Sequence, residues 1–173
     1  MLLHTDRIRL RNMESIKDIE AIRKIRNDAS TVNRFFSYRY ITEESQLEWF
    51  NNVKLDYTEI NWVIELLENK DIVGTLALIN IDWRNRNAEY ARLIINPSYR
   101  RMGLAFEAET LMLEYAFDYL NLHKIYCMAF MDNTDVINLH FKTGFKKVGI
   151  YSDHIFRDGK YQDIILLEQI RRF

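Results

Sequence analysis

The sequence predicts an α/β protein whose central sheet mixes antiparallel and parallel strands. Antiparallel strands joined by short polar turns are expected over residues 61–67, 72–81 and 88–95. Residues 104–120 then place apolar side chains at helical spacing, and another strand follows over 124–130. Strand, helix and strand in this order form a crossover, so the strands at 88–95 and 124–130 should run parallel.

The remaining elements complete the order β-α-α-β-β-β-α-β-α-β-β. They are a strand over 7–11, a helix over 15–27, a helix that begins after Thr42, a short helix over 134–142, and strands over 145–151 and 161–167. Ser15 and Thr42 suit N-cap positions, because a side-chain oxygen there can accept from a first-turn N–H. Gly144 suits a left-handed cap at the end of the short helix.

Length and composition limit the class of protein. The 173 residues suit one domain over 1–173, and a net charge of −1 gives no overall attraction to nucleic acid or to an acidic membrane. No apolar run is long enough to span a membrane, and charges come too early for a secretory signal, so we expect a cytoplasmic protein. We expect no metal, because no His, Cys and Asp cluster has ligand spacing.

The segment between Ile94 and Ala105 carries the strongest chemical signal. A strand ends there at a proline, and a basic turn with Arg100 and Arg101 leads into a helix. A helix N-terminus can hold phosphate through its free N–H groups and its positive dipole end. Gly103 would let the backbone approach such a ligand closely. On these grounds alone, an anion site and an ordinary basic surface turn fit about equally.

The run Arg100-Arg101-Met102-Gly103-Leu104-Ala105 resembles the R/Q-x-x-G-x-G/A signature of the GNAT superfamily of acetyl-CoA-dependent N-acetyltransferases. Its context is also similar: a strand before it, a long helix and a strand after it, then Asn133 ahead of a short helix and the pair Gly144-Phe145. The resemblance covers nearly the whole chain. It implies the GNAT fold and acetyl-CoA as co-substrate.

The resemblance also implies which residues bind acetyl-CoA. Backbone amides from about Arg101 to Ala105, which include Met102, Gly103 and Leu104, would hold the pyrophosphate, and Arg100 would add positive charge. The end of the preceding strand would splay from its neighbour and pair with the pantetheine arm; in this chain it consists of Leu93, Ile94 and Ile95. Asn133 matches a family asparagine that helps to position that arm.

Acetyl transfer to an amine needs a base and a proton donor, because the amine is mostly protonated at neutral pH and the thiolate must be protonated or stabilised. Glu89 matches a position where many relatives carry a glutamate and is the candidate base; its other interpretation is a solvated strand residue. Many relatives carry a tyrosine as the acid, whereas this chain has His140. His140 can donate a proton or serve as a hydrogen-bonded helix histidine, and Tyr126 and Tyr151 are other possible donors.

The acceptor is expected to be a small-molecule primary amine. Residues 119–126 and 158–163 resemble both the spermidine N-acetyltransferases and the amino-sugar-nucleotide N-acetyltransferases of pseudaminic acid biosynthesis. Residues 25–27, 81–86 and 139–140 resemble the second group more closely. An amino-sugar nucleotide is therefore the first choice.

An anionic nucleotide sugar needs arginines and aromatic rings. We expect these from Arg34, Phe35, Tyr38 and Arg39; a basic aromatic loop packed on the core fits the same segment. Glu43 and Glu44 would instead suit a polyamine, so spermidine is an alternative acceptor, and a protein N-terminus is another.

An alternative outside the enzymes is a module that binds acyl-CoA without turnover, because His140 replaces the tyrosine that many relatives use as the acid. The aromatic C-terminal strands offer an interface for a homodimer, a state common among relatives. Cys127 lies in an apolar run typical of a buried strand, which is a poor setting for a nucleophile. We therefore expect direct transfer in a ternary complex, with no acetyl-enzyme.

Overall fold

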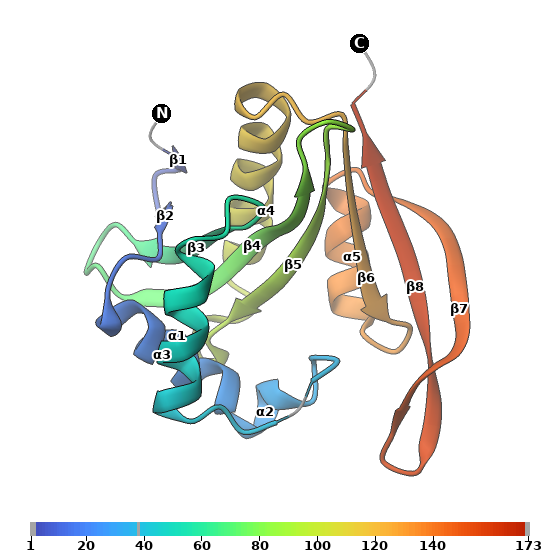
Figure 1. Cartoon of the computed structure of the whole chain (residues 1–173), viewed down its shortest axis with the longest axis horizontal. Helices are drawn as coiled ribbons and strands as arrows, with labels where there is room; N and C mark the ends of the chain where they lie inside the picture. Colours follow the sequence, from blue (N-terminus) through green and yellow to red (C-terminus); the bar gives the residue numbers. More distant parts are fainter. Residues whose placement is uncertain (1–2, 38, 172–173) are drawn as a thin grey trace.

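The computed structural model describes residues 3–37 and 39–171, and these residues form a mixed sheet with helices on both faces (Figure 1). The described strands follow the order β1-β2-β3-β4-β5-β6-β8-β7 across the sheet, and only β5 and β6 pair in parallel. Their bounds are Leu3–His4 (β1), Ile8–Asn12 (β2), Ile60–Leu66 (β3), Ile72–Asp82 (β4), Asn87–Ile95 (β5), Lys124–Phe130 (β6), Lys146–Arg157 (β7) and Lys160–Ile170 (β8). The parallel pair confirms the predicted crossover.

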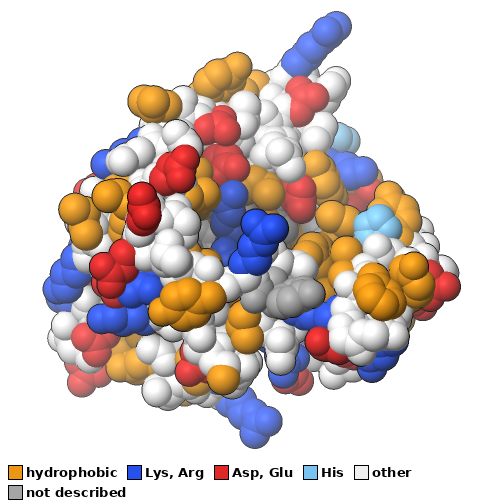
Figure 2. All heavy atoms as spheres, turned by 60° about the horizontal axis from the view of Figure 1, so that its bottom comes forward, with side chains coloured by type: hydrophobic (Ala, Val, Ile, Leu, Met, Phe, Trp, Pro, Cys, Tyr) orange, Lys and Arg blue, Asp and Glu red, His pale blue; other side chains and the backbone are white. Residues whose placement is uncertain are grey.

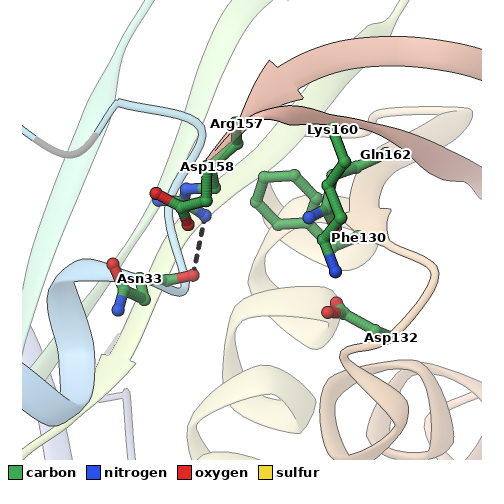
Figure 3. A pocket seen from close by; sticks show the side chains of 7 residues that line it. All are labelled: Asn33, Phe130, Asp132, Arg157, Asp158, Lys160 and Gln162. Carbon is green, nitrogen blue, oxygen red and sulfur yellow. Dashed lines mark hydrogen bonds between the residues drawn. The ribbon is translucent and has the colours of Figure 1, made fainter.

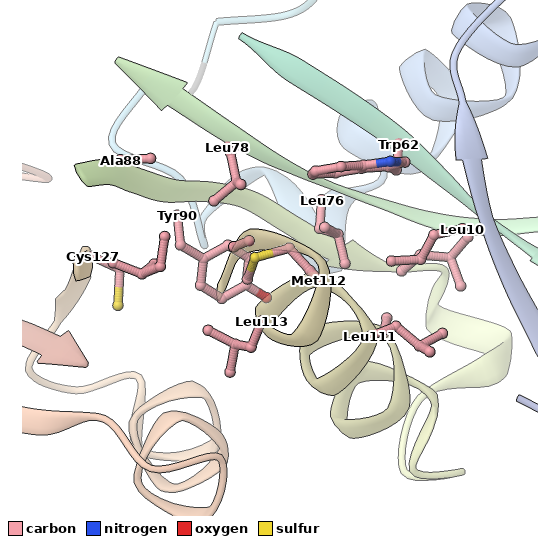
Figure 4. Packing of buried hydrophobic residues seen from close by; sticks show 14 of the residues in the cluster. Leu10, Trp62, Leu76, Leu78, Ala88, Tyr90, Leu111, Met112, Leu113 and Cys127 are labelled. Atoms are coloured by element: carbon pink, nitrogen blue, oxygen red, sulfur yellow. The ribbon is translucent and has the colours of Figure 1, made fainter. Parts of the chain in front are cut away.

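The helices divide between the two faces because side chains alternate along each strand. Val63 of β3 packs in a cluster with the isoleucines of α1, whereas its neighbours Trp62 and Ile64 belong to the cluster that includes α4. The helices are Ile16–Asn27 (α1), Ala29–Val32 (α2), Glu43–Val53 (α3), Leu104–Glu114 (α4) and Thr134–Lys142 (α5). Figure 4 shows Met112 of α4 among the side chains of the strands. None of the described helices is long and apolar enough to cross a membrane.

The predicted helix caps are confirmed. The side chain of Ser15 accepts from the N–H of Asp18, and the carboxylate of Asp18 accepts from the N–H of Ser15 in return. Thr42 caps α3 by accepting from the N–H of Ser45 at 3.1 Å. Gly144 follows α5 with a φ of 106°, in the left-handed region where glycine meets no Cβ penalty. Local sequence therefore sets where these helices begin and end.

Two predicted boundaries differ from the structure. The helix expected over 104–120 is α-helical only to Glu114, and a π-helical turn continues it over Tyr115–Tyr119. The strand expected over 145–151 extends as β7 to Arg157, because the hairpin with β8 continues after a register shift between Tyr151 and Ile155. Pairing with β8 thus outweighs the local turn preference of the polar residues after 151.

The opening between β5 and β6 is the feature of the fold that matters most for the site (Figure 1). The two strands pair only from Asn87 to Glu89 on β5. Beyond this point β5 stays with β4 as far as Ile95, while β6 pairs with β8 over its whole length. A bulge adds a residue to β5 near Arg92, whose φ is 61°, and bulges bend the strand that carries them. The strand end that includes Leu93, Ile94 and Ile95 therefore diverges from β6.

A buried carboxylate fastens α1 to the edge of the sheet. Asp18 is 3% exposed, and its two oxygens accept from Arg11 of β2 at 2.7 and 2.9 Å. Burial raises the pKa of Asp18, but the hydrogen bonds from Arg11 and from the N–H groups of Glu14 and Ser15 outweigh it and lower that pKa from 3.8 to about 2. The ionised form of Asp18 is therefore stabilised by folding.

The low pKa of Asp18 predicts how the free energy of unfolding changes at acidic pH. Because the folded pKa is lower than the unfolded one, the stabilisation of about 2 kcal/mol is present above about pH 4 and is lost as the pH falls toward about 2. Asp18→Asn should flatten the dependence of the free energy of unfolding on pH in this window, measured by urea titration at several pH values. The exposed Asp6→Asn is the control, and an unchanged slope in Asp18→Asn would contradict the assignment.

Candidate active site

The turn before α4 has the backbone of an anion site. Gly103 occupies the N-cap position with a φ of 81°, and it offers no side-chain hydrogen bond to the helix. Arg101 also lies in the left-handed region, with a φ of 63°. An added Cβ at Gly103 would come within 4 Å of only one described group, the Arg7 guanidinium at 3.4 Å. The helix end is thus open to a ligand, and its N–H groups and dipole suit the pyrophosphate of acetyl-CoA.

The arginines at this turn have different surroundings. Arg100 bonds the carbonyl of Ile95 at 3.2 Å, and its guanidinium donates to Thr31 at 2.6 Å, so it braces the turn against α2. Arg101 is exposed. Arg7, which the sequence analysis missed, pairs with Glu107 in the first turn of α4. No local pattern reveals Arg7, because it reaches the turn only through the packing of β2 against α4.

Glu89 lies at the apex of the opening. It is the last residue of β5 that pairs with β6, opposite Tyr126. Its half-buried carboxylate accepts a hydrogen bond from the side chain of Asn80 at 2.9 Å. Burial and the charge of Glu89 raise the pKa of Tyr126. Because strand side chains alternate, Glu89 and Tyr126 face away from Tyr90 and Cys127.

His140 lies on the other face of the sheet, beside Tyr90. The two rings are 5.4 Å apart between centroids, and His140 is only 4% exposed. Its Nδ1 lies 2.9 and 3.1 Å from the two carboxylate oxygens of Glu109, which is fully buried on α4. Tyr90 and Thr143 also donate hydroxyl hydrogen bonds to Glu109, at 3.3 and 2.5 Å. Tyr90 follows Glu89 in the chain, so the predicted base and donor flank the apex from opposite faces.

A cavity of about 500 Å³ lies between the segment after α2, the end of β6 and the β7–β8 hairpin (Figure 3). Arg157 donates to the carbonyls of Asn33 and Phe35 at 2.8 and 3.0 Å, and so holds this segment against the hairpin. The side chains of Lys160 and Asp132 point toward one another in Figure 3. Asn33, Phe130, Asp132, Arg157, Asp158, Lys160 and Gln162 line the cavity. It is polar and carries both signs of charge.

The residues predicted to bind the acceptor lie in the segment that Arg157 holds. Arg34 is exposed and donates to the side chain of Asn133 at 3.0 Å, so a predicted acceptor residue meets a predicted cofactor residue. Phe35 is half-buried, and Arg39 is exposed. Tyr38 lies outside the described residues. The segment therefore borders the opening from the side of α1.

Two further arginines lie on this side, and sequence reasoning did not single them out. The guanidinium of Arg26, at the end of α1, stands over the ring of Phe35 at 4.3 Å, and its Nε is buried with no hydrogen-bond partner among the described residues. Burial and the nearby charge of Arg92 lower the pKa of Arg26. Arg92, at the bulge of β5, pairs with Glu59 at 2.6 Å. Figure 2 shows a hollow on this side of the molecule, with Lys and Arg side chains in it and at its rim.

Comparison with known proteins agrees with this geometry. The family model described as "Acetyltransferase (GNAT) domain" matches residues 7–146. A spermidine N(1)-acetyltransferase of Vibrio cholerae is 30% identical over 147 residues, which are 85% of this chain and 84% of the relative. The crystal structure of a Vibrio cholerae spermidine N-acetyltransferase in complex with CoA and spermine superposes with a TM-score of 0.89 at 28% identity, over 96% of both chains. Acetyltransferase PseH of Campylobacter jejuni is 24% identical, over 80% of this chain and 84% of that protein.

The chain belongs to the GNAT family of acetyltransferases. It is an acetyl-CoA-dependent N-acetyltransferase. The pyrophosphate turn at Gly103 and the divergence of β5 from β6 are the parts of the structure that fit the co-substrate.

The placement of the pyrophosphate can be tested at Gly103. Gly103→Val should raise the KM for acetyl-CoA by about tenfold or more, because a branched side chain distorts the left-handed backbone and blocks close approach of phosphate. Gly159→Val is the matched control, since Gly159 has a φ of 78° and open surroundings but lies in the β7–β8 turn. An equal rise of the KM for acetyl-CoA in both variants, or a rise in neither, would contradict the placement of the pyrophosphate at this turn.

Proposed function

We propose that this chain acetylates the primary amine of a small molecule that also carries an anionic group, with an amino-sugar nucleotide as the first candidate. The observation that carries the proposal is the buried and unsatisfied Nε of Arg26 beside the like charge of Arg92. Burying a donor without a hydrogen-bond partner costs about 1 to 3 kcal/mol. A phosphate or carboxylate on the acceptor could accept from this donor and offset that cost, whereas a polycation offers no acceptor and would add a like charge.

A polyamine is the other candidate, and the comparisons support it better than they support an amino-sugar nucleotide, because the relatives in question are named as spermidine N-acetyltransferases. An acidic groove of about 400 Å³ between α1 and α3 also fits a cation, with Glu20, Glu43 and Glu44 in its lining. However, Glu20 and Glu43 already pair with Arg23, at 2.7 and 3.3 Å. The groove also lies at the first turns of α1 and α3, while Arg26 stands at the other end of α1. A cation in the groove would therefore not meet Arg26.

The proposed mechanism is direct transfer of the acetyl group to the amine. The group that accepts the amine proton and the group that protonates the sulfur lie on opposite faces of the sheet. Glu89 accepts a proton from the amine, directly or through water, as the amine attacks the carbonyl carbon of acetyl-CoA. His140 donates a proton to the sulfur as the carbon–sulfur bond breaks. Cys127 takes no part, because it is 3% exposed and burial, with the charges of Glu109 and Glu89, raises the pKa of its thiol well above the usual value.

The base is tested by Glu89→Gln, which keeps the shape and the bond to Asn80. We expect kcat to fall by about 10²- to 10⁴-fold, because a positioned base contributes this much to proton transfer. The acidic limb of the kcat–pH profile should also disappear. Glu168→Gln is a control on β8, where Glu168 lies opposite Tyr126 of β6 and pairs with Lys124. A fall in kcat with the acidic limb intact would show that Glu89 is not the titrating base.

The acceptor is tested by a screen of CoA release with spermidine, a UDP-linked 4-amino-sugar and an N-terminal peptide, on wild type and Arg26→Met. If the amino-sugar is acetylated, Arg26→Met should lower kcat/KM for it by about 10- to 100-fold, the range expected for a lost charge-assisted hydrogen bond. Lys24→Met, on the same helix but largely exposed, is the control. Turnover of spermidine alone, unchanged or improved in Arg26→Met, would overturn the anionic acceptor and leave acetyl transfer in place.

A further inference from the structure

Glu109 is a buried carboxylate that neither acetyl-CoA binding nor the base requires. It lies on the core face of α4 between the buried apolar residues Ala108 and Met112, with no exposed surface. Burying a carboxylate is unfavourable unless it is paired and hydrogen-bonded. Every described side chain that bonds to it is a donor, namely Tyr90, His140 and Thr143.

Of these donors, the imidazole of His140 is the one whose chemistry a carboxylate changes. Glu109 lies at hydrogen-bond distance from Nδ1, and a carboxylate there fixes the tautomer and the orientation of the ring. The second ring nitrogen, Nε2, is not among the side-chain atoms that the described structure leaves buried without a partner. A carboxylate that holds one imidazole nitrogen while the other transfers a proton is a recurring catalytic arrangement.

The position of the pair agrees with proton donation to sulfur. Tyr90, whose ring touches His140, is the first residue of β5 beyond the last pairing with β6. The pair therefore lies under the apex of the opening, across the sheet from Glu89. The titratable groups that face His140 are Glu109 on α4 and Tyr90 on β5; Cys127 on β6 is close enough for Glu109 to raise its pKa.

We infer that Glu109 is a positioning residue that holds His140 as the proton donor to the departing CoA thiolate. The inference rests on the proposed donor role of His140 but not on the identity of the amine. The nitrogen–carbon bond forms as the carbon–sulfur bond breaks. The electron pair of the carbon–sulfur bond moves to sulfur. The amine proton goes to Glu89, and Nε2 of His140 gives its proton to sulfur, so the products are the amide and CoA thiol. Solvent then restores both groups.

The inference also accounts for the departure from the tyrosine of many relatives. A tyrosine hydroxyl donates a proton without help from a carboxylate, whereas an imidazole must be held in one tautomer. His140 and Glu109 then replace that tyrosine as a pair. Glu109 should matter to catalysis only while residue 140 is histidine.

The test is a double-mutant cycle of Glu109→Gln and His140→Tyr, with Thr143→Val as the control that removes another hydrogen bond to Glu109. The readouts are kcat, the KM for acetyl-CoA, the kcat–pH profile and the thermal melt, with any amine that the screen shows to turn over. Glu109→Gln alone should lower kcat at least tenfold with KM within threefold, and should change the shape of the kcat–pH profile. In the His140→Tyr background, the same change should alter kcat less than threefold. Thr143→Val should leave the profile in place.

Equal losses of kcat from Glu109→Gln in both backgrounds, or an unchanged kcat–pH profile, would reduce Glu109 to a structural role. Nitrogen NMR of the His140 imidazole tests the contact with Glu109 without any acceptor amine. Wild type should show a proton on Nδ1, and Glu109→Gln should change how the proton is distributed between Nδ1 and Nε2. Failure of the acceptor screen with this signature intact would count against the proposed acceptor alone, whereas loss of the signature in the wild type would overturn the inference.

Discussion

The divergence of β5 from β6 is the constraint on which the rest of the structure depends. Two parallel strands normally satisfy each other's backbone groups along their length. Here the bulge at Arg92 turns β5 away after Glu89, while β8 holds β6 straight. A ligand arm can then take the place of the missing strand partner, and the reacting atoms come to the apex. The sheet thus provides both a binding edge and a fixed point for the chemistry.

The two faces of the sheet carry different groups at the opening. On the side of α1, Arg26 stands over Phe35, and Arg92 pairs with Glu59. On the side of α4, the apex meets a closed group of hydrogen-bonded side chains around Glu109. The proposed base and the proposed donor therefore lie on opposite faces of the sheet.

Most of the fold, and the cofactor turn, could be predicted because they depend on short-range patterns. Periodicity gave the helices, Ser15 and Thr42 marked two helix starts, and Gly103, within a run of six residues, marked the turn before α4. The residues that sequence reasoning missed or assigned differently depend on contacts across the sheet. Arg7 reaches α4 from about a hundred positions away, and Arg100 turns toward Thr31 on α2. Only the packed structure brings such pairs together.

The same distinction explains why the acceptor is harder to infer than the co-substrate. The proposed pyrophosphate site consists of backbone groups, which any sequence able to form the turn presents in the same way. The proposed acceptor site consists of side chains from α1, β5 and the β7–β8 hairpin, whose charge can change sign without a change of fold. A TM-score of 0.89 to a spermidine enzyme therefore fixes the scaffold and the reaction, while the charge around Arg26 bears on the amine.

One helix connects the two halves of the reaction. α4 begins at Gly103, where the pyrophosphate is placed, and carries Glu109 fewer than two turns later, about 9 Å along its axis. Because α4 is packed rigidly in the core, the phosphate anchor and the carboxylate that holds His140 keep a fixed separation. A co-substrate held at the start of α4 is thereby aligned with the group that orients the donor.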